Sequence, residues 1–205
     1  TMALNGIVCE NYPRIADAAK EAEWEFMGHG YVQGPMHNLD DQRDAIRRTI
    51  DAIGDFTGKP PRGWESPGLS ETDETIDILA DEGIEYVADW VLDDQPCRIG
   101  TETGSMISVP YTLETNDIPI FALQNQPSDA MLKRTIDQFE QLYAESETVT
   151  RVMAISVHPY LSGVPHRIGY LKEIYEHILG RSGVAMMTGE QILDWYLGEE
   201  KRLDA

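Results

Sequence analysis

Residues that can transfer a proton or bind a metal stand where apolar segments of this sequence end. His29 follows the apolar run 24–27 directly after Gly28, and His37 comes after a turn rich in Gly and Pro. A neutral imidazole nitrogen can bind a divalent metal or act as an acid or base. The spacing of the two histidines is not the helical i, i+4 pair that makes a metal motif specific, so a tight turn with a structural histidine is the alternative.

Polar side chains also end later apolar segments. Glu65 ends one short segment, Asp89 ends the segment after it, and His158 follows the β-prone run 151–157. When parallel strands form a barrel, their carboxyl ends meet at one mouth, where active sites lie. A single polar residue at such a place is usually structural, whereas four of them favour a functional cluster.

The chemistry that such a cluster supports is hydrolysis. A histidine-bound divalent metal can polarise a carbonyl or activate a water, and a separate histidine, here His158, can protonate a departing nitrogen. A carboxylate such as Asp89 can hold that imidazole in one tautomer. The sequence contains no G-x-S-x-G nucleophile motif, no P-loop and no G-x-G-x-x-G after a strand.

Composition narrows the classes of partner. The chain has 205 residues, 41% of them hydrophobic, and a formal net charge of −20. This charge argues against a nucleic-acid partner and against an anionic membrane surface, both of which need clustered Lys and Arg. Cys9 and Cys97 are too few for a disulfide framework. No apolar run is long enough to cross a bilayer and no secretory signal is present, so we expect a cytoplasmic protein.

Strand and helix patterns alternate along the chain, which predicts an α/β fold with a mainly parallel sheet or barrel. Amphipathic helices are expected over 40–56, 128–144 and 167–179, and a last one from Thr188. Short strands are expected near 2–9, 24–28, 62–65, 84–90, 106–109, 118–123, 151–157 and 184–187. No linker or repeat divides the pattern, so we expect one domain over residues 1–205.

The order of these motifs resembles the NodB-type polysaccharide deacetylase superfamily, closest to its branch of allantoinase-like and cyclic-imide hydrolases. The resemblance rests on four segments in sequence order, with a helix after the first: Glu25-Phe26-Met27-Gly28-His29-Gly30, Arg62-Gly63-Trp64-Glu65-Ser66-Pro67-Gly68, Val87-Ala88-Asp89-Trp90, and Ile155-Ser156-Val157-His158-Pro159. It implies an irregular (β/α)7 barrel with its site at the carboxyl-end mouth, and hydrolysis of a non-peptide carbon–nitrogen bond.

The resemblance also implies roles for single residues. His29 matches the first histidine of the family's metal pair, His158 its catalytic histidine, and Asp89 with Trp90 the motif that orients that histidine. Pro67 and Gly68 match the substrate-groove motif. We expect substrate to be lined in addition by Trp64, Glu65, Trp90 and Tyr160.

Two departures from the family pattern bear on the metal and on the length of the chain. Gln33 stands where the second metal histidine is expected, and His37 replaces it only if the turn holds an insertion of four residues. The family's first strand, which ends in an acidic residue, is not found before Met2, so we expect a barrel incomplete at its N-terminus. A divalent metal, with zinc considered first, and a metal-free reaction in which His158 is acid and base both stay open.

Three hypotheses about function remain. The first is an amidohydrolase acting on a small linear or cyclic amide. The second is a carbohydrate N-deacetylase of the same fold. The third is an inactive or partner-completed binding module, because a missing strand leaves an open sheet edge that invites pairing, and for the same reason we expect a homo-oligomer.

Overall fold

The computed structural model describes residues 1–203 and shows two compact units. Unit 1 holds Thr1–Trp90, Pro96–Val109 and the described part of the segment that begins at Met187, and unit 2 holds Val91–Gln95 and Pro110–Met186. The chain therefore leaves unit 1 twice and returns to it for its last helix. The single domain expected from the sequence stays a prediction.

Unit 1 is an α/β unit whose elements follow one another along most of the chain. They are β1 (Met2–Leu4), α1 (Ile7–Asn11), α2 (Pro13–Glu21), β2 (Phe26–Gly28), the short 3-10 helix η1 (Met36–Asn38), α3 (Gln42–Thr57), β3 (Gly63–Trp64), α4 (Thr75–Asp81), β4 (Tyr86–Val87), β5 (Cys97–Thr101), β6 (Gly104–Ser108) and α8 (Gly189–Leu203).

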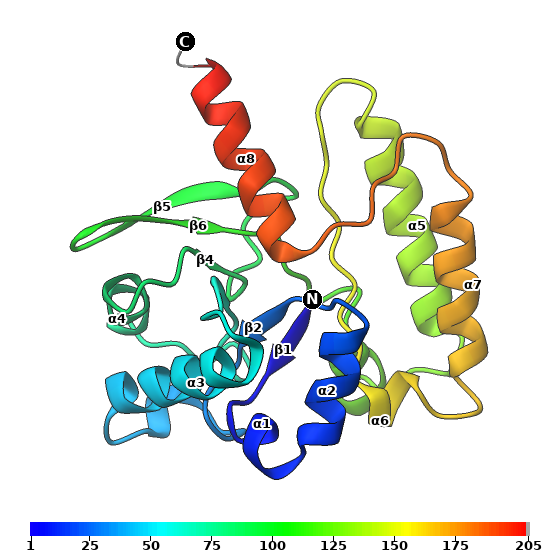
Figure 1. Cartoon of the computed structure of the whole chain (residues 1–205). Coiled ribbons are helices and arrows are strands. Elements are labelled where there is room, and N and C mark those ends of the chain that lie inside the picture. The colour runs from blue at the N-terminus through cyan, green and yellow to red at the C-terminus, as the bar shows by residue number, and fades with distance from the viewer. Residues whose placement is uncertain (204–205) are drawn as a thin grey trace. The chain divides into compact units, whose positions relative to one another are not determined.

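The sheet of unit 1 is mostly parallel, as the sequence predicts. Its strand order is β1-β2-β3-β4-β6-β5, and only the β5–β6 pair is antiparallel (Figure 1). The register pairs Gly28 with Trp64 and Trp64 with Val87, so the carboxyl ends of β2, β3 and β4 lie at one edge. Among the described residues the strands form an open sheet, and β1 is an edge strand. The expected homo-oligomer stays a prediction.

Helix α3 shows how the sequence determines these elements. Asp41 caps its start by accepting a hydrogen bond from the Asp44 backbone N–H (2.9 Å), and Gly58 ends it in the left-handed conformation with φ 89°. The predicted apolar stripe is confirmed, because Ile46 and Ile53 are fully buried. Ile46 packs in a cluster with Trp64 and Val87, which ties the helix to β3 and β4.

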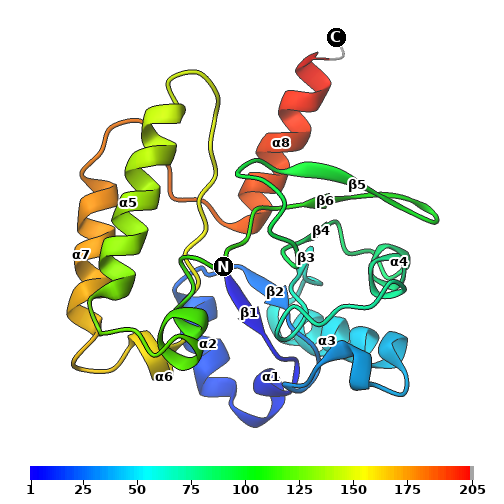
Figure 2. The same cartoon turned by 180° about the vertical axis from the view of Figure 1, so that it is seen from behind.

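Unit 2 is mostly helical and contains η2 (Ile118–Leu123), α5 (Ala130–Glu145), α6 (Pro159–Ser162) and α7 (Ile168–Leu179). Helices α5 and α7 run side by side in the views of Figure 1 and Figure 2. Their apolar faces enclose a core that includes Phe139 of α5 and Ile174 of α7, together with Phe121 of η2.

Three predicted strands are not strands in the structure. Residues 118–123 form a π-helical segment, because Pro119 cannot donate to a ladder and the side-chain oxygen of Asn116 accepts the Ile118 backbone N–H (3.0 Å), which starts a helical turn. Residues 184–187 have no regular structure. Residues 151–157 form no strand of a ladder and make one isolated bridge, Ser156 to Asn116. Apolar runs of this length do not by themselves distinguish a strand from a buried turn.

No helix within residues 1–203 combines the length and the apolar character needed to cross a lipid bilayer.

A buried hydrogen bond between a phenol and a carboxyl group holds the sheet of unit 1 at the start of β2 and β4. Tyr86 of β4 is 1% exposed, and its hydroxyl donates to Glu25 Oε1 (2.5 Å). The other oxygen of Glu25 accepts from the Glu190 backbone N–H (3.1 Å), in the first turn of α8. One carboxyl group thus connects β2, β4 and the last helix. The ring of Tyr86 has room only because its neighbours Gly63 and Gly189 lack a side chain.

Gly63→Ala is expected to lower the free energy of unfolding by about 3 kcal/mol, because overpacking a buried ring forces backbone shifts. A Cβ at Gly63 would lie 2.0 Å from Tyr86 Cζ. The ring cannot move away freely, because Gly189 also lies close to it, at a distance where a Cβ would be 2.1 Å from Tyr86 Oη. Urea unfolding measures the change. The matched control is Gly198→Ala in α8, where a Cβ meets nothing within 4 Å. This control should gain about 0.5–1 kcal/mol from helix propensity. Equal stability of the two variants would contradict the packing argument.

Candidate active site

Polar groups at the ends of β1, β2, β3 and β4 form a continuous chain of contacts in unit 1. Asn5, after β1, donates its amide to the backbone carbonyl of His29. His29, after β2, makes a 2.7 Å hydrogen bond through Nδ1 to the carbonyl of Glu65. Ser66, after β3, donates its backbone N–H to Asp89 Oδ1 (2.5 Å), after β4. Of the predicted strand-end residues, His29, Glu65 and Asp89 are thus linked by these contacts, whereas the fourth, His158, belongs to unit 2 and its convergence with them stays a prediction.

The loop conformations beside these contacts depend on two glycines. Gly30 has φ +72°, and a Cβ there would lie 3.1 Å from Pro67 Cγ, so the loop after β2 packs on the loop after β3. Gly68 has φ +68° and turns the chain directly after Pro67. Residues with a Cβ rarely adopt this conformation. The Pro67-Gly68 segment predicted to border substrate is therefore a fixed turn, with Pro67 buried and Gly68 exposed.

Trp64 shapes this loop from beneath. It is fully buried, and a Cβ on Gly28 would lie 2.5 Å from its Cε3 atom, so the indole ring lies over β2. Its Nε1–H donates to Ser66 Oγ (3.1 Å). The described contacts of Trp64 are thus the packing of its ring on β2 and one hydrogen bond to the side chain of Ser66. Its predicted role in lining substrate stays a prediction.

Asp89 is a buried acid with few partners. It is 2% exposed, and its Oδ2 has no hydrogen-bond partner among the described residues. Burial raises the pKa of Asp89 from its usual 3.8 to about 8; the Ser66 N–H acts in the opposite direction, and the carboxylates of Glu71 and Glu65 add to the rise. Asp89 therefore carries a proton at neutral pH.

A second acid–base pair lies in unit 2. His158 Nδ1 is 2.7 Å from Asp117 Oδ1, and the His158 backbone N–H donates to Asp117 Oδ2 (2.7 Å). Ser162 Oγ donates to the same Oδ2 at 2.7 Å. Asp117 is fully buried, whereas the side chain of His158 is 32% exposed. Because a carboxylate only accepts, Nδ1 of His158 carries a hydrogen, and in the neutral ring Nε2 then carries the lone pair.

The carboxylate bonded to His158 is thus Asp117, while the described contact of Asp89 is with Ser66. The sequence pattern does not single out Asp117, because it predicts a strand over 118–123, and Asp117 then precedes a strand instead of following one. Asn5 and Ser66 were missed as well. Asn5 follows a short strand that the sequence pattern had extended to Cys9, and Ser66 acts through its backbone N–H, which no residue type reveals.

The other predicted site residues differ in exposure. In unit 1, Glu65 is buried at 8% exposure, Trp90 is half-buried and His37 is exposed in η1. In unit 2, Tyr160 is 68% exposed, and its ring centroid lies 5.7 Å from that of His158 in an edge arrangement. The structure thus places Tyr160 beside the catalytic candidate of its own unit.

The described side chains do not fit a complete metal site. Within residues 1–203, no three His, Cys, Asp or Glu side chains gather closely enough to hold a metal ion. His29 has the orientation typical of a metal ligand, since its Nδ1–H donates to a backbone carbonyl. A single histidine is not a ligand set, and no step of the proposed reaction is therefore assigned to a metal.

Comparison with a family model and with known sequences shows similarity to polysaccharide deacetylases. Residues 1–87 match the family model for polysaccharide deacetylase. A Schizosaccharomyces pombe protein whose name places it among polysaccharide deacetylases is 28% identical over 206 residues, which cover 91% of this chain and 64% of that protein. The peptidoglycan deacetylase of Helicobacter pylori is 24% identical over 231 residues, covering 94% of this chain and 75% of that enzyme.

Among solved structures, the crystal structure of Puue allantoinase matches with a TM-score of 0.85 and 26% identity, over 92% of this chain and 64% of that one. The predicted resemblance to the polysaccharide deacetylase superfamily and the predicted α/β fold of the deacetylase type are thereby confirmed. This chain spans 64% of the length of the fission-yeast relative and of the allantoinase.

Asp89→Asn is expected to remove a pH dependence of stability. Because the folded pKa lies above the usual one, the folded chain keeps a proton that the unfolded chain releases, and the free energy of unfolding falls as pH rises from about 4 to about 8. At about pH 9 the variant should be more stable than the parent by about 1–3 kcal/mol, since a buried charge is replaced by a neutral amide. Near pH 4 the two should be nearly equal.

Urea unfolding at several pH values measures this difference, with the exposed Asp73→Asn as the control. A parent protein that gains stability between pH 5 and pH 8 relative to Asp89→Asn would show that Asp89 is ionised in the folded state, contrary to the burial argument.

Proposed function

We propose that this chain hydrolyses an amide carbon–nitrogen bond outside peptide bonds, with His158 as the acid–base group. The observation that carries the proposal is the pair formed by His158 and the fully buried Asp117. Deacetylase-type hydrolysis is also the activity named for the H. pylori relative. Since this chain spans only part of several relatives, the activity of the whole protein is part of the proposal.

The chemistry follows from the tautomer of His158. Its Nε2 accepts a proton from a water as the water oxygen attacks the amide carbon, which gives a tetrahedral intermediate. The resulting imidazolium donates the same proton to the amide nitrogen, the C–N bond breaks, and a carboxylic acid and an amine leave. Asp117 keeps the ring oriented and stabilises the imidazolium while it exists.

Two substrate classes fit this reaction, and the comparisons change their order. The sequence analysis put a small linear or cyclic amide first. The names of the two curated relatives favour an N-acetylated carbohydrate, and we therefore propose this class first. The small amide is second, supported by the allantoinase structure. Acetate release from N-acetylglucosamine oligomers would support the first class, and ring opening or ammonia release from small amides the second.

Asp117→Asn is expected to lower kcat/KM by about 10²- to 10⁴-fold with little change in KM, since the amide no longer holds the correct imidazole tautomer. His158→Ala should cost a similar factor through loss of the proton transfer. Both are measured on whichever substrate class the parent protein turns over. The effects should not add in the double variant, because the two residues act as one unit.

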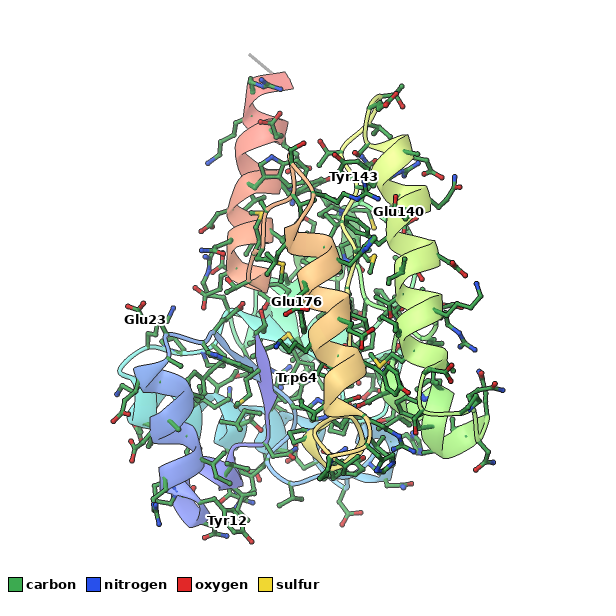
Figure 3. All side chains as sticks on the ribbon, turned by 90° about the vertical axis from the view of Figure 1, so that its right-hand side faces the viewer. Tyr12, Glu23, Trp64, Glu140, Tyr143 and Glu176 are labelled. Atoms are coloured by element: carbon green, nitrogen blue, oxygen red, sulfur yellow. The ribbon has the colours of Figure 1, made fainter. Side chains whose placement is uncertain are left out.

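The matched control is another carboxylate–histidine pair of unit 2. Glu140 of α5 accepts from His177 Nε2 at 2.6 Å, and Figure 3 shows Glu140 on this helix one turn before Tyr143. Glu140→Gln should leave turnover unchanged, because this pair lies on the helical surface away from the α6 turn that carries His158. Full activity of His158→Ala on every accepted substrate would overturn the proposal. No turnover by the parent protein would instead favour the binding-module hypothesis.

A further inference from the structure

One peptide group in unit 1 is hydrogen-bonded by a side chain on each of its two sides. The carbonyl of Glu65 accepts from His29 Nδ1 at 2.7 Å. The N–H of the same peptide, which belongs to Ser66, donates to Asp89 Oδ1 at 2.5 Å. His29 and Asp89 are thus connected through a single amide, although they come from different strands and are sixty residues apart in the sequence.

This arrangement occurs where the backbone ladder stops. The Glu65 N–H still donates to Gly28 O (2.9 Å), and the Ala88 N–H still donates to Trp64 O (2.9 Å). In a regular parallel sheet the next carbonyl and the next N–H of β3 would pair with backbone groups of β2 and β4. Here the imidazole of His29 and the carboxyl of Asp89 take these two places.

An amide hydrogen-bonded at one end becomes a better partner at the other. Donation from the Ser66 N–H to Asp89 shifts electron density toward the Glu65 carbonyl oxygen, which then accepts more strongly from His29. The amide is also rigid and planar, so its two partners are held in a fixed relation. Loss of the acceptor on Asp89 would weaken the contact to His29 and free the peptide to rotate.

Asp89 can accept the Ser66 N–H as a neutral acid. With 2% exposure and an Oδ2 that lacks a hydrogen-bond partner among the described residues, the group is held as a neutral acid, in agreement with a pKa of about 8. A neutral carboxyl still accepts through Oδ1, and it does so without the cost of a buried charge. An asparagine would offer the same acceptor oxygen, whereas an alanine would not.

We propose that Asp89 is a positioning residue for His29, acting through the Glu65–Ser66 peptide to fix the imidazole of His29 in its Nδ1–H tautomer. In the neutral ring, Nε2 of His29 is then the basic nitrogen. The inference goes beyond the proposed function, which assigns no step to His29.

The first test needs no substrate. Nitrogen-15 NMR of the full chain with labelled histidine, at a pH well above about 6.5 so that the rings are neutral, distinguishes the two ring nitrogens of each histidine. The signals of His29 are assigned by their loss in His29→Ala. The expected result is one dominant tautomer with hydrogen on Nδ1. An equal mixture of tautomers, or hydrogen on Nε2, in the parent protein would overturn the proposal directly.

Three variants then separate positioning from general loosening of the loop. Asp89→Asn should keep the Nδ1–H tautomer, and Asp89→Ala should give a mixture of tautomers. Ser66→Ala is the matched control, because it removes the hydroxyl, which contacts the Trp64 indole N–H and Asp89, but keeps the backbone N–H to Asp89 on which the proposal rests. It should therefore leave the tautomer of His29 unchanged.

Retention of the single tautomer in Asp89→Ala, or an equal change in Ser66→Ala, would contradict the proposal. If Asp89→Ala does not fold, the parent spectrum and the Asp89→Asn spectrum decide, since a change of tautomer in Asp89→Asn also contradicts it. Failure of the proposed function would appear as an absence of turnover with these spectra unchanged, so the two failures are distinguishable.

Discussion

The place where the parallel ladder of β2, β3 and β4 stops is the constraint on which the unit 1 site depends. Parallel strands put their carboxyl ends at the same edge, and the pairing of Gly28 with Trp64 and of Trp64 with Val87 aligns the residues that follow. Backbone groups beyond that point still need partners. The side chains of His29 and Asp89 supply these hydrogen-bond partners. Two residues that can take part in acid–base chemistry therefore also complete the hydrogen bonding of the sheet.

Three buried carboxyl groups, those of Asp117, Glu25 and Asp89, accept hydrogen bonds from backbone N–H groups and side chains. Asp117 receives three hydrogen bonds, from the backbone and ring of His158 and from Ser162. Glu25 likewise accepts from Tyr86, from the Glu190 N–H and from Thr1. Asp89 accepts from Ser66, and burial raises its pKa. Asp117 orients a histidine through these hydrogen bonds, whereas burial lets Asp89 keep its proton.

The two histidines are held by different means, which follows from their surroundings. His29 extends from a paired strand and contacts the backbone of its neighbour. His158 follows a segment with only one isolated bridge, so the sheet does not position it. Its orientation comes from Asp117 and from the short helix α6, whose last residue Ser162 binds the same carboxylate. Side-chain hydrogen bonds in unit 2 therefore do what strand pairing does in unit 1.

The sequence by itself determined the alternation of strands and helices, the buried stripe of α3 and the presence of polar residues at strand ends, because each of these is a local pattern of apolar spacing and turn residues. It also carried enough ordered motifs to predict the deacetylase-type fold. It failed for 118–123, where an apolar run of strand length folds as a helical turn started by Asn116. Only the tertiary structure decided which groups pair. Asp117 meets His158 across 41 residues, and Ser66 meets Asp89 through a backbone N–H. Such contacts depend on the three-dimensional course of the chain, and no residue type or spacing encodes them locally.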